Sequence, residues 1–119
     1  MKAQLSKTFV FDAAHHLLCV PEGHKCAHTH GHRYRLTVTV EGEVDPKVGW
    51  VMDFDRIKLA VAPLLAQLDH HDLNDLNLPN TTSECIAKWV WDALKPALPE
   101  LKSVAVAESE TSNCLYEGR

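Results

Sequence analysis

Two segments of alternating apolar and polar residues constrain the fold of this chain more than any other feature. Apolar side chains, among them Phe9 and Phe11, fall on one side of residues 3–13. Residues 33–44 repeat the pattern, with Tyr34 on the apolar side. A period of two residues is typical of strands with one buried face. The sequence therefore predicts two strands here, antiparallel to each other.

The next segment has helical spacing. Apolar residues recur three and four positions apart over residues 54–68, and Asp53 is suited to cap the start of a helix. Pro63 lies inside this segment, where proline removes a hydrogen bond and favours a kink. We expect one helix from about residue 54 to residue 68.

A second helix and two short strands complete the pattern. Thr81 and Glu84 have the spacing of a capping box, in which each side chain covers a free backbone amide of the other. A helix should follow to about Leu94, and apolar runs at 104–107 and 114–116 predict two strands.

The element order strand, strand, helix, helix, strand, strand indicates an α+β fold. We expect a four-stranded antiparallel sheet with both helices on one face. No repeat or linker interrupts the 119 residues, so residues 1–119 are interpreted as a single domain. Such a sheet has two open edges, which assembly can cover, and we therefore expect a homo-oligomer.

Charge and cysteine content exclude several kinds of partner. Twelve Lys and Arg against sixteen Asp and Glu give a net charge of −4, which argues against nucleic acid or an acidic membrane. Residues 1–16 have no apolar run of signal-peptide length, and no later segment could span a membrane. Four cysteines without a pairing pattern favour reduced thiols. We expect a cytoplasmic protein.

Histidine is concentrated in one part of the chain. Six of the eight histidines fall within residues 15–32. His30 and His32 lie two apart at the entry to the second strand, so both rings face the same side, and His15 ends the first strand. Three nitrogens with a fourth position open are typical of catalytic zinc. Surface histidines held by hydrogen bonds are the alternative, and His28 could replace one of the three ligands.

Cys26 allows two interpretations, because it lies four residues before His30. It could be a fourth ligand that closes a structural zinc site. It could also be an unligated thiolate beside the metal, with its pKa lowered by positive charge such as that of Lys25.

Two further positions carry carboxylates beside groups that could react. Asp69 precedes His70 directly, and a carboxylate can fix the tautomer of a histidine and raise its basicity, although a solvated helix end is an equal alternative. Glu108 falls on the inward side of the strand at 104–107, where a carboxylate needs donors, for example those of a ligand. Glu110 falls on the same side and competes with it.

Six motifs follow one another along nearly the whole chain: Phe11-Asp12-Ala13-Ala14-His15; Pro21-Glu22-Gly23-His24-Lys25-Cys26 leading into His30-Gly31-His32; Gly49-Trp50-Val51-Met52-Asp53-Phe54; Leu68-Asp69-His70-His71; Asn80 to Glu84; and Glu108 with Tyr116-x-Gly118 behind it. Together they resemble the 6-pyruvoyltetrahydropterin synthase family, most closely its 6-carboxy-5,6,7,8-tetrahydropterin synthase branch. Thr81 stands where this family commonly has proline, and Ser109 where threonine is usual.

The resemblance implies the tunnelling fold (T-fold), in which trimers close their sheets into a β-barrel and often stack as hexamers. It also implies zinc on His15, His30 and His32. No other cofactor is implied.

The same resemblance implies roles for four more side chains. Cys26 would be unligated and accept a proton, with Asp69 and His70 as its catalytic partners, supplied across a subunit interface. Glu108 would bind the pterin ring, whose neighbouring N–H donors suit one carboxylate. Lys25 and Arg33 are candidates for holding the triphosphate.

The reaction that the resemblance implies is a zinc-dependent lyase reaction of queuosine (7-deazaguanine) biosynthesis. It converts 7,8-dihydroneopterin triphosphate into 6-carboxy-5,6,7,8-tetrahydropterin, acetaldehyde and triphosphate. Two alternatives remain at this point. A 6-pyruvoyltetrahydropterin synthase would eliminate triphosphate from the same substrate without carbon–carbon cleavage, and a zinc-binding module would have no turnover.

Overall fold

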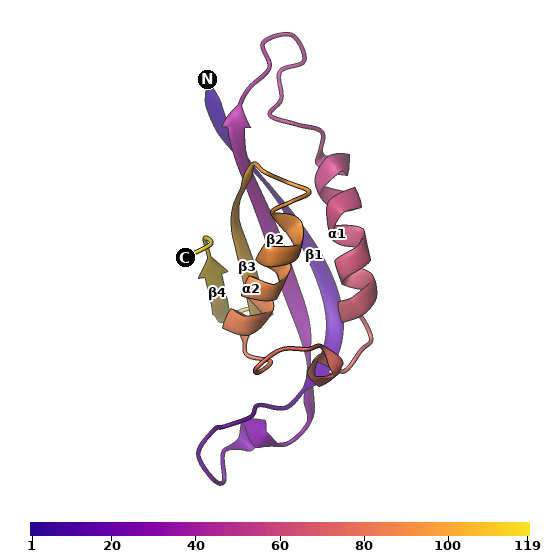
Figure 1. Ribbon diagram of the computed structural model, residues 1–119, viewed down its shortest axis with the longest axis vertical. Helices are drawn as coiled ribbons and strands as arrows, with labels where there is room; N and C mark the ends of the chain where they lie inside the picture. Colours follow the sequence, from indigo (N-terminus) through magenta and orange to yellow (C-terminus); the bar gives the residue numbers. More distant parts are fainter.

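In the computed structural model, which describes residues 1–119, two long strands make up most of the sheet. Strand β1, Lys2–His15, pairs antiparallel with β2, His30–Glu43, along its whole length (Figure 1). This confirms the predicted strand pair. Both strands extend beyond the alternating segments because the backbone ladder continues through the histidines at one end.

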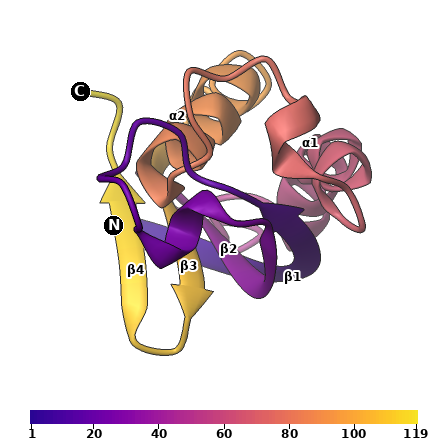
Figure 2. The same ribbon diagram turned by 90° about the horizontal axis from the view of Figure 1, so that it is seen from below.

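Strands β3, Leu101–Ser109, and β4, Ser112–Tyr116, complete the sheet in the order β1-β2-β3-β4. Helices α1, Phe54–Leu68, and α2, Ser83–Leu94, cover the same face of the sheet, as Figure 2 shows. The predicted element order and the placement of both helices are confirmed.

The core lies between the sheet and the helices. Alternate residues of β2 point into it, and Tyr34, Leu36 and Val38 are fully buried. The opposite face of the sheet carries hydroxyl groups that pair across strands, as Thr8 and Thr37 do at 3.0 Å. One apolar and one polar face follow directly from the period-two pattern of the sequence.

Helix α1 has the predicted limits. The Asp53 side chain accepts a hydrogen bond from the Asp55 amide and caps its start. Pro63 lies within the helix without ending it. The carbonyl that Pro63 cannot bond belongs to Leu59, a residue on the outer side of the helix that is 73% exposed, where solvent can satisfy that group.

Helix α2 begins one residue later than the expected capping box requires. Thr82, not Thr81, is the cap, and its hydroxyl accepts from the Cys85 amide at 3.2 Å. The Thr81 hydroxyl instead donates to the His16 carbonyl, and Thr81 is buried. The prediction of Thr81 as the cap was therefore wrong, because a tertiary hydrogen bond takes the side chain that local spacing had assigned to the helix.

The connection between β1 and β2, residues 16–29, projects from the end of the sheet as a loop (Figure 1). It contains a short 3-10 helix, Lys25–Ala27. A parallel bridge between Ala14 and Asp72 brings the segment after α1 alongside the end of β1. None of the helices is both long and apolar enough to cross a bilayer.

Candidate metal centre and active site

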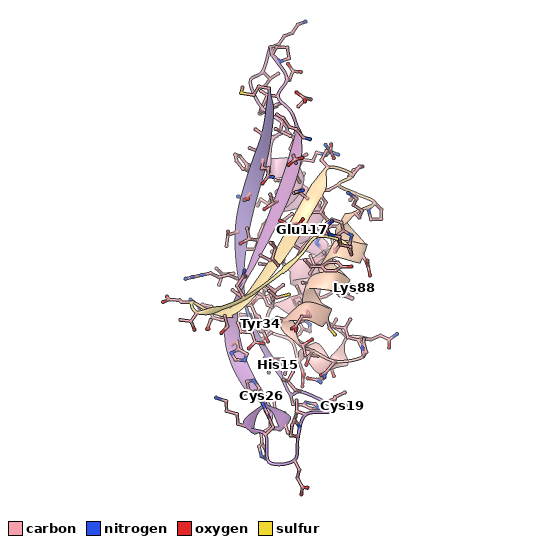
Figure 3. All side chains as sticks on the ribbon, turned by 90° about the vertical axis from the view of Figure 1, so that its left-hand side faces the viewer. His15, Cys19, Cys26, Tyr34, Lys88 and Glu117 are labelled. Carbon is pink, nitrogen blue, oxygen red and sulfur yellow. The ribbon has the colours of Figure 1, made fainter.

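The three histidines singled out in the sequence meet at the end of the β1–β2 pair. His15 lies opposite His30 in the ladder, and His32 lies opposite Ala13. One ring nitrogen from each histidine falls within 4.8 Å of the other two. Figure 3 shows His15 between Tyr34 on the sheet and Cys26 on the loop. The expected convergence of these rings is confirmed.

Hydrogen bonds fix the orientation of two of these rings. The Nδ1 of His15 donates to the Thr81 carbonyl at 2.9 Å, and the Nδ1 of His30 donates to the His28 carbonyl at 2.8 Å. A carbonyl can only accept a hydrogen bond, so each Nδ1 carries a proton. In the neutral rings each Nε2 is therefore unprotonated and has a free lone pair. Backbone carbonyls commonly orient metal-binding histidines in this way.

The remaining nitrogens fit a metal ion. The Nε2 atoms of His15 and His30 lie 3.0 Å apart, and the Nε2 of His32 is buried without a hydrogen-bond partner. Two convergent imidazole lone pairs beside a third ring nitrogen without a partner are the kind of nitrogen ligands that a borderline cation such as Zn²⁺ binds. The His28 ring is exposed and outside this cluster, so His28 contributes its carbonyl rather than its side chain.

Burial also favours the ligand form of His15. This side chain is 1% exposed, and desolvation, the largest influence, lowers its pKa below the usual value of about 6.5. The hydrogen bond to Thr81 opposes this shift, and the nearby His30 reinforces it. His15 is therefore held in the neutral state that can bind a cation.

Cys26 lies beside the histidines, on the short helix of the projecting loop. It is half-buried and lines a cavity of about 390 Å³ together with Lys25, His30, His32 and Glu108. The three-histidine cluster does not include its sulfur. The structure therefore brings Cys26 to the same cavity as two of the candidate ligands, outside the cluster that the three histidines form.

Glu108 borders the same cavity from β3. Its Oε2 lies 3.6 Å from the Nε2 of His32, and its Oε1 accepts a hydrogen bond from the Ser83 hydroxyl at 3.0 Å. Glu110 lies in the exposed turn between β3 and β4. Glu110 also lines a cavity with His32, but of the two glutamates left open by the sequence only Glu108 lines the cavity that contains Cys26.

Asp69 and His70 form a pair at the end of α1. The Nδ1 of His70 lies 3.0 Å from the Asp69 Oδ1, and Asp69 also accepts from the Asp12 amide. His70 has a φ of 59°, a left-handed conformation that is held by its own amide donating to the Asp12 carbonyl at 2.6 Å. Strain of this kind outside glycine is frequent at functional sites.

The structure does not place this pair beside Cys26 within one chain. His70 lines a different cavity of about 600 Å³ together with Asp12 and Arg33, and Asp69 is hydrogen-bonded to the Asp12 amide there. This cavity and the Cys26 cavity have His32 in common, but Cys26 does not line it. Arg33 is engaged there, in an ion pair with Asp12 at 3.0 Å. Lys25 lines the Cys26 cavity, and Arg33 and Arg35 both line an adjoining cavity with Glu108. Of the two cations considered for the triphosphate, Lys25 is the one beside Cys26.

Two residues of this site could not be identified from the sequence. Thr81 acts through its carbonyl, which any residue offers, so no residue type marks that role. Ser83 reaches Glu108 from the first turn of α2, a contact between segments 25 residues apart. The Asn80 to Glu84 motif was the only signal that this region is functional.

Comparison with known proteins identifies the family. The model of the family "6-pyruvoyl tetrahydropterin synthase" matches residues 4–119. The chain belongs to this family. Like its solved members, it has the T-fold: the structure of 6-pyruvoyl tetrahydropterin synthase from Caenorhabditis elegans superposes with a TM-score of 0.92 at 27% identity, over 100% of this chain and 97% of the other.

Two curated members of the 6-pyruvoyl tetrahydropterin synthase family differ in their named products. A 6-carboxy-5,6,7,8-tetrahydropterin synthase of Synechocystis is 43% identical, over 92% of this chain and 89% of its own length. The 6-pyruvoyl tetrahydrobiopterin synthase of Homo sapiens is 35% identical, over 98% of this chain and 92% of its own. Membership supports a pterin synthase activity for this chain, and both products occur among its relatives.

Proposed function

We propose that this chain is a zinc-dependent lyase that acts on 7,8-dihydroneopterin triphosphate. With one water consumed, the products are 6-carboxy-5,6,7,8-tetrahydropterin, acetaldehyde and triphosphate, as in 7-deazaguanine and queuosine biosynthesis. The observation that carries the proposal is the cavity in which Cys26, Glu108 and two of three convergent histidines meet. The 43% identity to a relative of this name supports the choice of product.

His15, His30 and His32 would hold the zinc, because their ring nitrogens converge and the Nε2 of His32 has no hydrogen-bond partner. When bound, zinc would polarise the hydroxyls of the substrate side chain and lower their pKa. The carbonyls of Thr81 and His28 keep two of these rings in the tautomer that presents Nε2 to the ion.

Cys26 is the proposed proton acceptor at the carbon chain of the substrate. Its thiol lies at the wall of the cavity and outside the histidine cluster, so it is available to a substrate. His70, oriented by the Asp69 carboxylate, is the proposed partner that takes up and returns the second proton. Proton transfer at two positions requires two such groups with pKa values near the working pH.

Glu108 is proposed to bind the pterin ring through the ring's 2-amino and N3–H donors. The Ser83 hydroxyl holds one carboxylate oxygen and so limits rotation of the side chain. Holding the ring in one orientation leaves only the side chain of the substrate near Cys26. Lys25 is the proposed contact for the triphosphate, because it lines the same cavity as Cys26.

Because Cys26 and His70 line different cavities of one chain, we propose that His70 of one subunit serves Cys26 of the next. The polar, uncovered face of the sheet and its two edge strands support a trimer closed into a barrel, and a hexamer of two trimers. The whole chain, 1–119, would act as one domain. Its four free cysteines fit the expected cytoplasmic setting.

The second candidate is a 6-pyruvoyltetrahydropterin synthase, favoured by the 35% identity to the human enzyme of that kind. One assay separates the possibilities: incubate purified, zinc-loaded protein with 7,8-dihydroneopterin triphosphate and measure acetaldehyde and triphosphate. Acetaldehyde in equal amount to triphosphate supports the carboxy product. Triphosphate without acetaldehyde indicates the pyruvoyl product, and neither product would reject both in favour of a zinc-binding module.

A further inference from the structure

The segment that follows β1, residues 16–18, connects the last residue of that strand, His15, to the loop that carries Cys26. It has no neighbouring strand on the side that faces residues 72–82. The backbone groups of His16 and Leu18 on that side are nevertheless all paired, and their partners are side chains. Two asparagines supply most of them, and the Thr81 hydroxyl also donates to the His16 carbonyl.

Asn74 pairs with His16 in the manner of a neighbouring peptide. Its Oδ1 accepts from the His16 amide at 2.9 Å, and its Nδ2 donates to the His16 carbonyl at 3.0 Å. A carboxamide has the same donor and acceptor as a backbone peptide, so one side chain satisfies both groups.

Asn80 repeats this arrangement two residues further along. Its Oδ1 accepts from the Leu18 amide at 3.0 Å, and its Nδ2 donates to the Leu18 carbonyl at 2.8 Å. The same Oδ1 accepts from the Thr81 amide at 2.9 Å, which places the Thr81 carbonyl opposite the ring of His15. Asn80 is thus bonded to the residue that orients a candidate zinc ligand.

Leu17, between His16 and Leu18, directs its backbone amide to the opposite side of the segment. The Leu17 amide donates to the Cys26 carbonyl at 2.7 Å. Alternate residues of an extended segment present their backbone groups to opposite sides, so the two asparagines hold one side and Cys26 is bonded to the other. The position of Cys26 relative to His15 therefore depends on how firmly residues 16–18 are held.

We infer that Asn74 and Asn80 are positioning residues that set the location of Cys26 against the three histidines. This inference rests on the proposed roles of Cys26 and the histidines. It assigns to the asparagines no contact with substrate or metal. Their effect passes through the backbone of residues 16–18 and, for Asn80, also through Thr81.

The test compares Asn74→Ala and Asn80→Ala with Asn77→Ala, a matched control in the same segment whose exposed side chain makes no hydrogen bond. Zinc-loaded proteins are treated briefly with iodoacetamide and digested with trypsin, and alkylation is followed in two peptides. Cys26 lies in the peptide Cys26–Arg33, and Cys114 lies in Ser103–Arg119 as an internal reference. Amide hydrogen exchange at Leu17 is measured in parallel.

In both Asn74→Ala and Asn80→Ala, Cys26 should be alkylated at least about fivefold faster than in the parent, and the Leu17 amide should exchange at least about tenfold faster. The alkylation rate of Cys114 should stay that of the parent. Asn77→Ala should match the parent. Unchanged rates at Cys26 and Leu17 would overturn the inference, and so would equal increases at Cys26 and Cys114, which indicate general loss of stability. If an alanine variant fails to fold, Asn74→Asp and Asn80→Asp, which lose only the donors, are measured instead.

Failure of the proposed function gives a different result. If the Cys26 sulfur binds zinc, alkylation of the parent will be slow with zinc and fast after chelation. The exchange rate of the Leu17 amide still tests the effect of Asn74 and Asn80 in that case, because this amide donates to the backbone carbonyl of Cys26 and not to its thiol.

Discussion

The Nε2 atoms of His15 and His30 lie 3.0 Å apart, and neither has a proton to share when the rings are neutral, because both Nδ1 atoms donate to backbone carbonyls. Two lone pairs at this distance repel each other. A metal ion bound between the two nitrogens would remove this repulsion, whereas burial disfavours a proton there because it lowers the pKa of His15.

His30→Ala and His32→Ala should therefore remove most of the zinc. Two nitrogens in water hold zinc poorly, and about one zinc per chain is expected in the parent. Elemental analysis after dialysis measures this directly. His28→Ala is the matched control and should keep its zinc, since only its carbonyl contacts His30. Full zinc in either ligand variant would reject the assignment.

Cys26→Ala distinguishes a catalytic thiol from a structural ligand. We expect normal zinc content and pterin affinity, with turnover slower by about a hundredfold or more, as for loss of a general base. Zinc content, substrate binding and acetaldehyde release are measured on the same preparation. Loss of zinc, or turnover close to that of the parent, would contradict the proposal.

His70→Ala should resemble the cysteine variant if both residues belong to one proton relay. The double variant should then cost little beyond either single change, because groups that act as a unit are not additive. Multiplicative losses in turnover, determined under saturating substrate, would show instead that the two residues act independently.

Glu108→Gln should weaken substrate binding without affecting zinc. The change keeps the size of the side chain but turns one acceptor into a donor, which then faces a donor of the pterin ring. Ser83→Ala should have a smaller effect in the same direction, because it removes the hydrogen bond that holds the Glu108 carboxylate. Binding is measured by calorimetry with Glu110→Gln as control. A larger loss in the control would favour Glu110.

The metal-free chain should lose stability in mild acid. Burial lowers the pKa of His15 in the folded chain below the value of about 6.5 that it has in the unfolded chain. Between these two pKa values the unfolded chain binds a proton that the folded chain does not. The stabilisation is present above pH 6.5 and is lost as the pH falls through the folded pKa. Urea unfolding of chelator-treated protein at about pH 7.5 and about pH 5 measures the loss. His15→Asn, which retains a donor for Thr81, should show a smaller difference; an equal difference would refute this origin.

Periodicity was sufficient to predict the sheet, α1 and the meeting of the three histidines. These features follow from which side of a strand or helix each residue faces, and that is a local property. The predicted start of α2 was wrong by one residue, because the Thr81 hydroxyl donates to the carbonyl of His16, 65 positions away. Such contacts depend on how distant segments pack and leave no local pattern.

Other features of the candidate site could not be predicted for the same reason. The left-handed conformation of His70 depends on a carbonyl of Asp12 in β1. The roles of Asn74 and Asn80 depend on backbone groups of residues 16–18 that lack a strand partner. In both cases the partner is main chain, which has the same donors and acceptors at nearly every position.

The separation of Cys26 and His70 into two cavities has a consequence for mixtures of inactive proteins. Cys26→Ala subunits still provide His70, and His70→Ala subunits still provide Cys26. If each site joins Cys26 of one subunit and His70 of its neighbour, random reassembly of equal amounts should restore about a quarter of the sites. Half of the subunits provide an intact Cys26, and half of their neighbours provide an intact His70. Two preparations with little turnover of their own would then complement each other, and the wild-type chain would lose activity when diluted below the dissociation constant of the oligomer.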